Sequence, residues 1–127
     1  MAKIGLLVDT DVFIDYLNSG RFASILEARR FAIYYTAVTR KELLAKRGLR
    51  SREREAILEA LKRHRLVRLD SRIAGRYWSL RNAHRNLPKE DALIAATALV
   101  KRLPLVTRNW RHYRDIPDLV LFAGDSR

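Results

Sequence analysis

Short apolar runs alternate with stretches of helical periodicity along this chain, and the alternation is the feature that most restricts its fold. The runs that predict strands are residues 3–8, 31–38, 66–69, 104–107 and 119–122, and the predicted helices are 12–18, 21–30, 39–46, 51–64, 71–85 and 88–100, with a single turn at 109–113. Strands that alternate with helices form parallel sheets covered by helices on both faces. We therefore expect an α/β fold with a central parallel sheet of about four to five strands, built as one domain over residues 1–127.

Polar side chains follow several of these predicted strands at the point where each strand ends. Asp9 comes directly after the first strand, Glu42 lies in the first turn of the helix after the second, and Asn109 follows the fourth by two residues. Asp91 lies in the first turn of the helix that starts near Pro88. Because sites in parallel sheets form beyond the carboxyl ends of the strands, we expect these four side chains to share one location.

Each of these acids also has a purely structural explanation. A side chain in the segment 9–11 could form the N-cap of the next helix, and Thr39 with Glu42 has the spacing of a capping box. Asp91 could stabilise its helix through the macrodipole alone. Capping does not require the acids to share a location. Their convergence at one end of the sheet would therefore favour a shared functional site over helix capping.

A converging group of carboxylates is costly without a cation. Two unit charges about 4 Å apart repel by about 4 kcal/mol at an effective dielectric constant of about 20, and a bound cation or proton removes that cost. The chain has no cysteine, and we assign no catalytic role to its histidines, which share no metal-ligand spacing: His64, His84 and His112. Ligands that are oxygens alone fit Mg²⁺ or Mn²⁺, and such a cation suggests metal-assisted hydrolysis of phosphodiester bonds.

Basic residues outnumber acidic ones by 26 to 14, which gives a formal net charge of +12. The segment 46–85 alone holds thirteen Lys and Arg against four acids. A surface of this kind attracts polyanions, of which nucleic acid is the commonest. The alternative is that these side chains are solvated or paired on helix surfaces, but the shortage of acids disfavours ion pairing for the whole segment.

Four stretches of the sequence, in this order, resemble the landmarks of PIN-domain ribonucleases. They are LLVDTDVFIDYL near the N-terminus, the Glu of AVTRKELL, then EDALIAATAL and LVTRN. The chain is most similar to the single-domain VapC-type toxins of prokaryotic toxin–antitoxin pairs. This resemblance implies one PIN-like domain that acts as a metal-dependent endoribonuclease and leaves 5′-phosphate and 3′-hydroxyl ends on RNA.

The resemblance also implies roles for the acids. Asp9, Glu42 and Asp91 correspond to the family acids that bind Mg²⁺ or Mn²⁺ and activate water. The fourth family acid falls at Asn109, where an amide contributes no charge, so the presence of a second metal ion stays open. The expected auxiliary residues are Asp11, Thr107 and Asn109.

Basic side chains near the expected site are candidate RNA contacts, although each could equally be a solvated surface charge. They are Arg40, Lys41, Lys46 and Arg108. Aromatic side chains could stack on RNA bases, and the candidates are Tyr77, Trp78, Trp110 and Tyr113. We expect Tyr77 and Trp78 instead in the core or a dimer interface, and Trp110 in the packing of the last turn.

The resemblance to VapC-type toxins further implies a homodimer and a VapB-type antitoxin whose tail covers the acidic site. The apolar faces of helices 21–30 and 51–64 would suit such a peptide, although burial in the core explains the same residues. The first apolar run is too short for a signal peptide, and no run approaches the roughly 18 residues of a membrane span. Together with the absence of cysteine, this predicts a cytoplasmic protein outside the membrane.

Two other functions stay open at the level of the sequence. The stretch DTDVF also resembles the Asp-x-Asp nucleophile motif of haloacid-dehalogenase-type phosphatases, but the chain is short for that class and has no Asp-Asp pair. The second alternative is a non-catalytic PIN-like RNA-binding module with a weakened metal site, which the amide at Asn109 would support.

Overall fold

The computed structural model describes residues 2–123, and its centre is a four-stranded parallel sheet. The strands are β1 (Ile4–Val8), β2 (Phe31–Thr36), β3 (Arg65–Val67) and β4 (Leu105–Val106). The helices are α1 (Thr10–Ser19), α2 (Ala23–Leu26), α3 (Ala37–Leu44), α4 (Ser51–Lys62), α5 (Ser71–Ala83), α6 (Lys89–Lys101) and α7 (Trp110–Tyr113). The expected α/β architecture is confirmed. No helix within residues 2–123 has the length and apolar character needed to cross a membrane.

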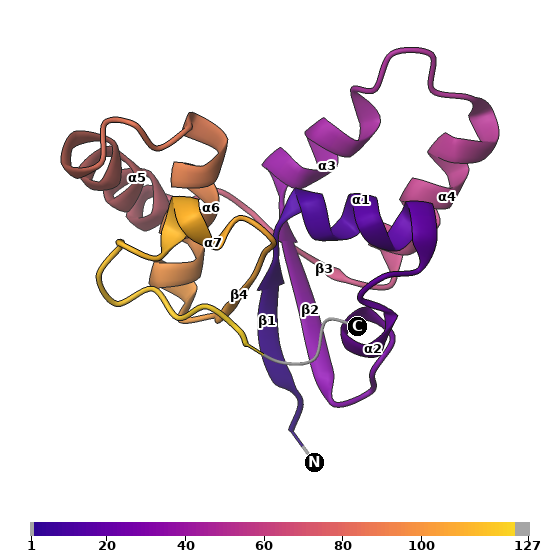
Figure 1. The fold of residues 1–127 in the computed structure, drawn as a ribbon, viewed down its shortest axis with the longest axis horizontal. Helices are drawn as coiled ribbons and strands as arrows, with labels where there is room; N and C mark the ends of the chain where they lie inside the picture. Colours follow the sequence, from indigo (N-terminus) through magenta and orange to yellow (C-terminus); the bar gives the residue numbers. More distant parts are fainter. Residues whose placement is uncertain (1, 124–127) are drawn as a thin grey trace.

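Helices cover both faces of the sheet (Figure 1). The helices α1 to α4 pack on one face, and α5 to α7 pack on the other. Each face has its own hydrophobic core: the first core lies beneath α1 to α4, and the second core lies beneath α5 to α7. Successive side chains of a strand point to opposite faces, so Leu6 and Val8 enter the first core while Leu7 enters the second core. Because β1 is apolar on both faces, it occupies the inside of the sheet.

The chain changes its direction across the sheet at β1. The strand order is β3-β2-β1-β4, so the chain first builds outward from β1 and later returns to add β4 on the other side of it. In such sheets ligand sites form at this point, above the carboxyl ends of the two neighbouring strands. The N–H group of Asp9 donates to the carbonyl of Val106 at 2.9 Å, so the residue after β1 lies beside the end of β4.

The predicted helix over 21–30 is wrong in extent, since only α2 forms there. Its N-cap, Phe22, is buried and has a φ of 70°, which breaks regular helix geometry on the N-terminal side. On the other side, the carbonyl of Ala28 accepts the N–H of Phe31 in the turn that leads into β2. The segment therefore turns twice within ten residues, which the apolar spacing did not reveal.

Other boundaries differ from the prediction by a few residues, and two of the differences have a clear physical cause. The helix α3 begins at Ala37 rather than Thr39, because the hydroxyl of Thr36 caps it by accepting the N–H of Thr39. The predicted last strand, 119–122, is reduced to a single bridge between Leu121 and Leu105. The partner strand β4 is only two residues long, so it offers little edge on which a fifth strand could pair.

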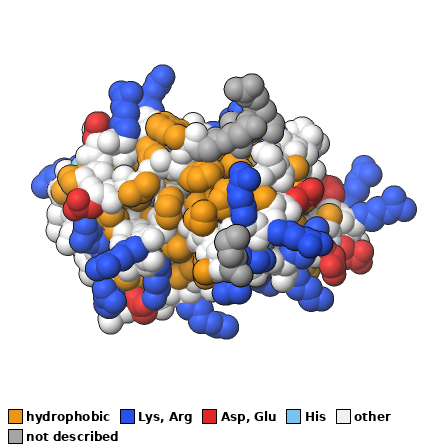
Figure 2. Space-filling view, turned by 90° about the horizontal axis from the view of Figure 1, so that it is seen from below, with side chains coloured by type: hydrophobic (Ala, Val, Ile, Leu, Met, Phe, Trp, Pro, Cys, Tyr) orange, Lys and Arg blue, Asp and Glu red, His pale blue; other side chains and the backbone are white. Residues whose placement is uncertain are grey.

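The face at the N-terminal ends of the strands is apolar in its middle and basic at its margin (Figure 2). Two of the exposed hydrophobic residues, Ile4 and Val120, belong to segments at this end of the sheet. The acids that follow the strands belong to the opposite end, so the two ends of the sheet differ in chemistry.

Candidate active site

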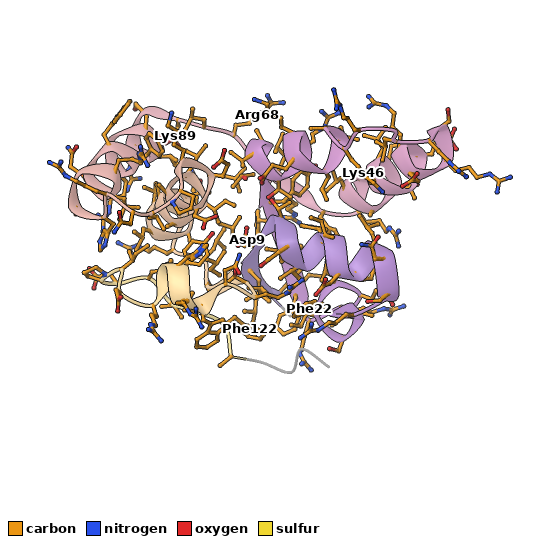
Figure 3. All side chains as sticks on the ribbon, turned by 45° about the horizontal axis from the view of Figure 1, so that its top comes forward. Asp9, Phe22, Lys46, Arg68, Lys89 and Phe122 are labelled. Carbon is orange, nitrogen blue, oxygen red and sulfur yellow. The ribbon has the colours of Figure 1, made fainter. Side chains whose placement is uncertain are left out.

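Asp9 lies at the centre of a buried hydrogen-bond cluster, between α1 and the helices of the opposite face (Figure 3). Its Oδ1 accepts the N–H of Thr10 at 2.8 Å. Its Oδ2 accepts the hydroxyl of Thr107 at 2.8 Å and the hydroxyl of Tyr113 at 3.1 Å. Asp9 is also the N-cap of α1, so capping and membership of the cluster are not exclusive here.

Glu42 is tied to α1 through two threonine hydroxyls. Thr10 donates its hydroxyl to Glu42 Oε1 at 2.8 Å, and the buried hydroxyl of Thr39 lies 2.9 Å from that of Thr10. Because Thr10 uses its proton on Glu42, Thr39 donates to Thr10. The capping-box explanation for Glu42 is therefore wrong, since Thr36 is the N-cap of α3 and Glu42 reaches across to another helix.

Asp91 contributes a third carboxylate from the first turn of α6. Its side chain is 16% exposed, and its Oδ2 lies 2.6 Å from Nδ1 of His112 on α7. No spacing in the sequence pointed to His112, which lies 21 positions further along the chain. The short helix α7 thus brings two successive side chains to the site, His112 to Asp91 and Tyr113 to Asp9.

The three acids lie close enough to affect one another. Burial raises the pKa of Asp9, hydrogen bonds from two threonines oppose that rise, and repulsion by Asp91 adds to it. Burial likewise raises the pKa of Glu42, a hydrogen bond from Thr10 opposes it, and repulsion by Glu90 and the other two acids adds to it. Isolated helix caps do not require this mutual repulsion, which is a property of carboxylates gathered at one place.

Asp11 lies at the edge of the same group. Burial, followed by repulsion from Asp9, raises the pKa of Asp11 to about 6, although the N–H of Arg108 donates to its Oδ2 at 3.3 Å. Its Oδ1 is buried and has no hydrogen-bond partner among the described residues. Such an orphaned carboxylate oxygen beside other acids is suited to a cation or to a water molecule that a cation holds.

The expected auxiliary residues have different surroundings. Thr107 is buried and donates to Asp9, as described above. Asn109 is exposed, its backbone N–H donates to the hydroxyl of Thr107 at 3.0 Å, and its side chain does not cap α7. Asn109 therefore supports the loop after β4 through its backbone, and the structure does not bring its amide onto the acids.

The candidate RNA contacts divide into two pairs. Arg108 donates to Asp15 at 2.7 Å and Lys46 donates to Glu53 at 3.1 Å, so both are already engaged. Arg40 and Lys41 are exposed on α3 and form no ion pair with any residue in the described part of the chain. Of the four, these two have charges that remain available to a polyanion.

The aromatic residues match the expectation only in part. Tyr77 packs against the core as expected. Tyr113 is fully buried with its hydroxyl on Asp9, so it is not a platform for RNA bases. Trp78 is 62% exposed, which excludes it from the core of this chain, and Trp110 is 44% exposed rather than packed beneath the last turn.

No three His, Asp or Glu side chains within residues 2–123 already surround one point as metal ligands. In the described structure each of the three acids directs at least one oxygen at a protein donor. The donor chemistry nevertheless fits a hard divalent cation, because the group consists of neutral hydroxyl oxygens and of carboxylates whose negative charges repel one another.

Comparisons with known proteins agree with this arrangement. The model of the PIN domain matches residues 6–118. Ribonuclease VapC19 of Mycobacterium tuberculosis is 35% identical over 124 residues, which cover 89% of this chain and 95% of that protein. Ribonuclease VapC1 of Methanocaldococcus jannaschii is 29% identical over 126 residues, which cover 95% of this chain and 88% of that protein.

Solved structures give the same result. A toxin–antitoxin complex from Klebsiella pneumoniae matches with a TM-score of 0.75 and 31% identity, covering 91% of this chain and 95% of that one. VapBC2 from Rickettsia felis, bound to a DNA fragment from its promoter, matches with a TM-score of 0.85 and covers 96% of this chain and 100% of that one; at 21% identity it shows the shared fold. The sequence and fold comparisons together establish that the chain belongs to the PIN-domain family, as a member of the VapC type.

Proposed function

We propose that this protein is a metal-dependent endoribonuclease and the toxin of a VapBC-type pair. The observation that carries the proposal is the convergence of Asp9, Glu42 and Asp91 beyond the carboxyl ends of the central strands, on a chain of net charge +12. An acidic centre on a basic protein suits the hydrolysis of a polyanion. The relatives VapC19 and VapC1 are both ribonucleases, which supports RNA as the substrate.

In this proposal Asp9, Glu42 and Asp91 hold Mg²⁺ or Mn²⁺. When bound there, the cation lowers the pKa of a water molecule and offsets negative charge on the phosphate. The protein itself orients the ligands: Thr107 and Tyr113 fix the carboxylate of Asp9 through its Oδ2. The pair Thr39 and Thr10 fixes Glu42 in the same way. Exposed Arg40 and Lys41, beside Glu42 on α3, attract the RNA backbone.

The test is cleavage of total cellular RNA by the purified protein in the presence of Mg²⁺ or Mn²⁺. It is compared with cleavage in the presence of EDTA and with cleavage by an Asp91→Asn variant. We expect cleavage that requires the cation and falls at least 100-fold in Asp91→Asn, since loss of a residue that merely supports a ligand already costs about 10- to 100-fold. The folded state should survive, because asparagine can still accept a hydrogen bond from His112. Asp115→Asn, which changes an exposed acid beyond α7, is the matched control and should cut like the wild type.

Two results would contradict the nuclease proposal. Equal cleavage by the wild type and by Asp91→Asn would show that a contaminant cuts the RNA. Binding of RNA without cleavage by the wild type would favour the non-catalytic RNA-binding module.

The proposed antitoxin partner has a suitable surface. A groove of about 340 Å³ lies between α1, α3 and α4, and Glu42 is among its lining residues. Its apolar lining consists of Ile14, Leu17, Leu43, Leu49, Ala56 and Ile57. A peptide bound in this groove would reach the acidic site. Both proteins would meet in the cytoplasm, where RNA is found. An Ile14→Arg variant, which changes a groove side chain that is 43% exposed, should no longer co-purify with the protein of the neighbouring small reading frame; co-purification at wild-type yield would contradict this placement.

A second copy of the chain is the proposed partner of another apolar surface. Trp78 and Leu69, each 62% exposed, border a groove of about 480 Å³ between α3, α5 and α6. Apolar side chains that gather in one exposed patch, as Trp78 and Leu69 do around this groove, typically mark an interface. Light scattering should report a dimer for the wild type and a monomer for Trp78→Arg, whereas a monomeric wild type would exclude the homodimer.

A further inference from the structure

We propose that α7 is the positioning element of the acidic site, and that His112 holds the carboxylate of Asp91 in the orientation that binds a divalent cation. The identity of the bound group rests on the proposed function.

The geometry of α7 supports this role. Tyr113 is fully buried and anchors the helix in the second core, where its hydroxyl donates to Asp9. The N–H of His112 donates to the carbonyl of Asn109 at 3.0 Å, which fixes the start of the turn. With its backbone held on both sides, His112 can place Nδ1 2.6 Å from Asp91 Oδ2 while its ring stays 44% exposed.

Asp91, like the other two acids, needs a hydrogen-bond partner that fixes its carboxylate. The torsion that turns a carboxylate is broad, so the group rotates unless hydrogen bonds fix it. Asp9 is fixed by a backbone N–H and two hydroxyls, and Glu42 by the hydroxyl of Thr10. For Asp91 the short contact is with His112 at 2.6 Å, and the hydroxyl of Tyr113 also lies within hydrogen-bonding range, so both side chains that orient this carboxylate come from α7.

The same geometry bears on the missing fourth acid. The family motif places that acid at Asn109, yet Asn109 is exposed and turns its backbone to Thr107. His112, less than one helical turn further along the chain, reaches Asp91 instead, next to Tyr113 on Asp9. An imidazole adds a hydrogen-bonding nitrogen without adding a negative charge to carboxylates that already repel one another.

The experiment measures Mn²⁺ affinity directly, by titration calorimetry on the full chain without RNA, and RNA cleavage in parallel. His112→Ala removes the partner of Asp91, and we expect Mn²⁺ affinity to fall about 10- to 100-fold. His112→Asn keeps an N–H donor near the place of Nδ1, so it should restore most of the affinity. Arg111→Ala, an exposed change on the same helix, should bind Mn²⁺ like the wild type. Thermal unfolding without metal should be alike in all four proteins, because His112 lies at the surface.

Wild-type Mn²⁺ affinity in His112→Ala would overturn the inference. A loss in His112→Asn as large as in His112→Ala would also overturn it, since the ring and not the hydrogen bond would then matter. If the wild type binds Mn²⁺ but cuts no RNA, the proposed function fails while the role of His112 is decided by the affinities. If the wild type cuts RNA and His112→Ala binds Mn²⁺ unchanged, only the inference fails. A wild type that binds no Mn²⁺ overturns both.

Discussion

The charged side chains at the acidic edge of the sheet and those in the basic region of α4 and α5 differ in their burial and in their hydrogen bonding. At the acidic edge, Asp9 and Asp91 are largely buried, and side chains from distant segments hydrogen-bond to them. Along α5 no acid accompanies the arginines, and Arg72 and Arg76 are exposed without an ion pair in the described structure. The comparison indicates that the function of the acidic edge depends on the position of individual oxygen atoms, whereas the attraction of polyanions by the basic surface depends only on its total charge.

Replacing one acid on each side should give the largest contrast between the two regions. Glu42→Gln keeps an oxygen that can accept the hydroxyl of Thr10 but removes a proposed metal ligand, so we expect cleavage of RNA to fall by about 100-fold or more. Glu59→Gln removes an acid of the same type from α4, where it is 70% exposed and forms only a surface pair with Lys62. That variant should cleave RNA at the wild-type rate. Equal losses in the two variants would remove the distinction between the regions.

A smaller effect concerns stability and pH at the acidic edge. Burial and the neighbouring Asp9 raise the pKa of Asp11 from 3.8 to about 6, so the folded state holds this proton more tightly than the unfolded chain does. The ionised carboxylate therefore destabilises the fold, and the penalty grows as pH rises from about 4 through about 6. Asp11→Asn removes the penalty, and the resulting gain above pH 7 should be about 1–2 kcal/mol after allowance for partial exposure.

Urea unfolding of both proteins at pH 4 and pH 8, without divalent cations, measures this difference. The gain from Asp11→Asn should be present at pH 8 and nearly absent at pH 4, so the change between the two pH values is the readout. Asp115→Asn, at an exposed acid, serves as the control and should show little change between them. A gain of the same size at both pH values would refute the electrostatic explanation.

The smallest effect belongs to the basic surface. Arg72→Gln combined with Arg76→Gln should weaken RNA binding only severalfold. The slope of log K against log salt concentration should become shallower by about 0.7 for each phosphate that is no longer neutralised. The cleavage rate at saturating RNA should not change, because neither residue lies among the acids. The double replacement by lysine keeps the charge and should bind like the wild type. A fall in the saturated rate would mean that α5 takes part in the site itself.

The sequence predicted most of the fold because its signals were local and repeated. The apolar run that forms β1 is buried on both faces, and α6 is apolar nearly all round, so each element has only one environment that suits it. The boundaries that failed depended on tertiary contacts. Thr36 rather than Thr39 starts α3, and the predicted last strand met a partner strand too short to extend it.

The candidate site was predictable in part for the same reason. In a parallel sheet, residues that follow the strands lie near the carboxyl ends of those strands, where sites form. The residue types and positions of Asp9, Glu42 and Asp91 were therefore sufficient to predict them as site residues. Their partners were not predictable. Thr39 bonds to Thr10 from 29 positions away, and Tyr113 bonds to Asp9 from 104 positions away, and no periodic pattern encodes such pairs.

By itself, the sequence determined the α/β class, the positions of Asp9 after β1 and of Asp91 in the first turn of α6, and the basic net charge. The expectation that Glu42 lies in the first turn of its helix is wrong, because α3 begins at Ala37 and Glu42 therefore falls in its second half. Only the tertiary structure decided which side chains orient those acids, since that depends on how α7 docks beside α6 and the end of β1. It placed His112 beside Asp91 and left Asn109, the expected auxiliary residue, with its backbone on Thr107. The physical reason is that periodicity reports burial along one element, whereas a hydrogen bond between elements depends on angles and distances fixed only when the whole core packs.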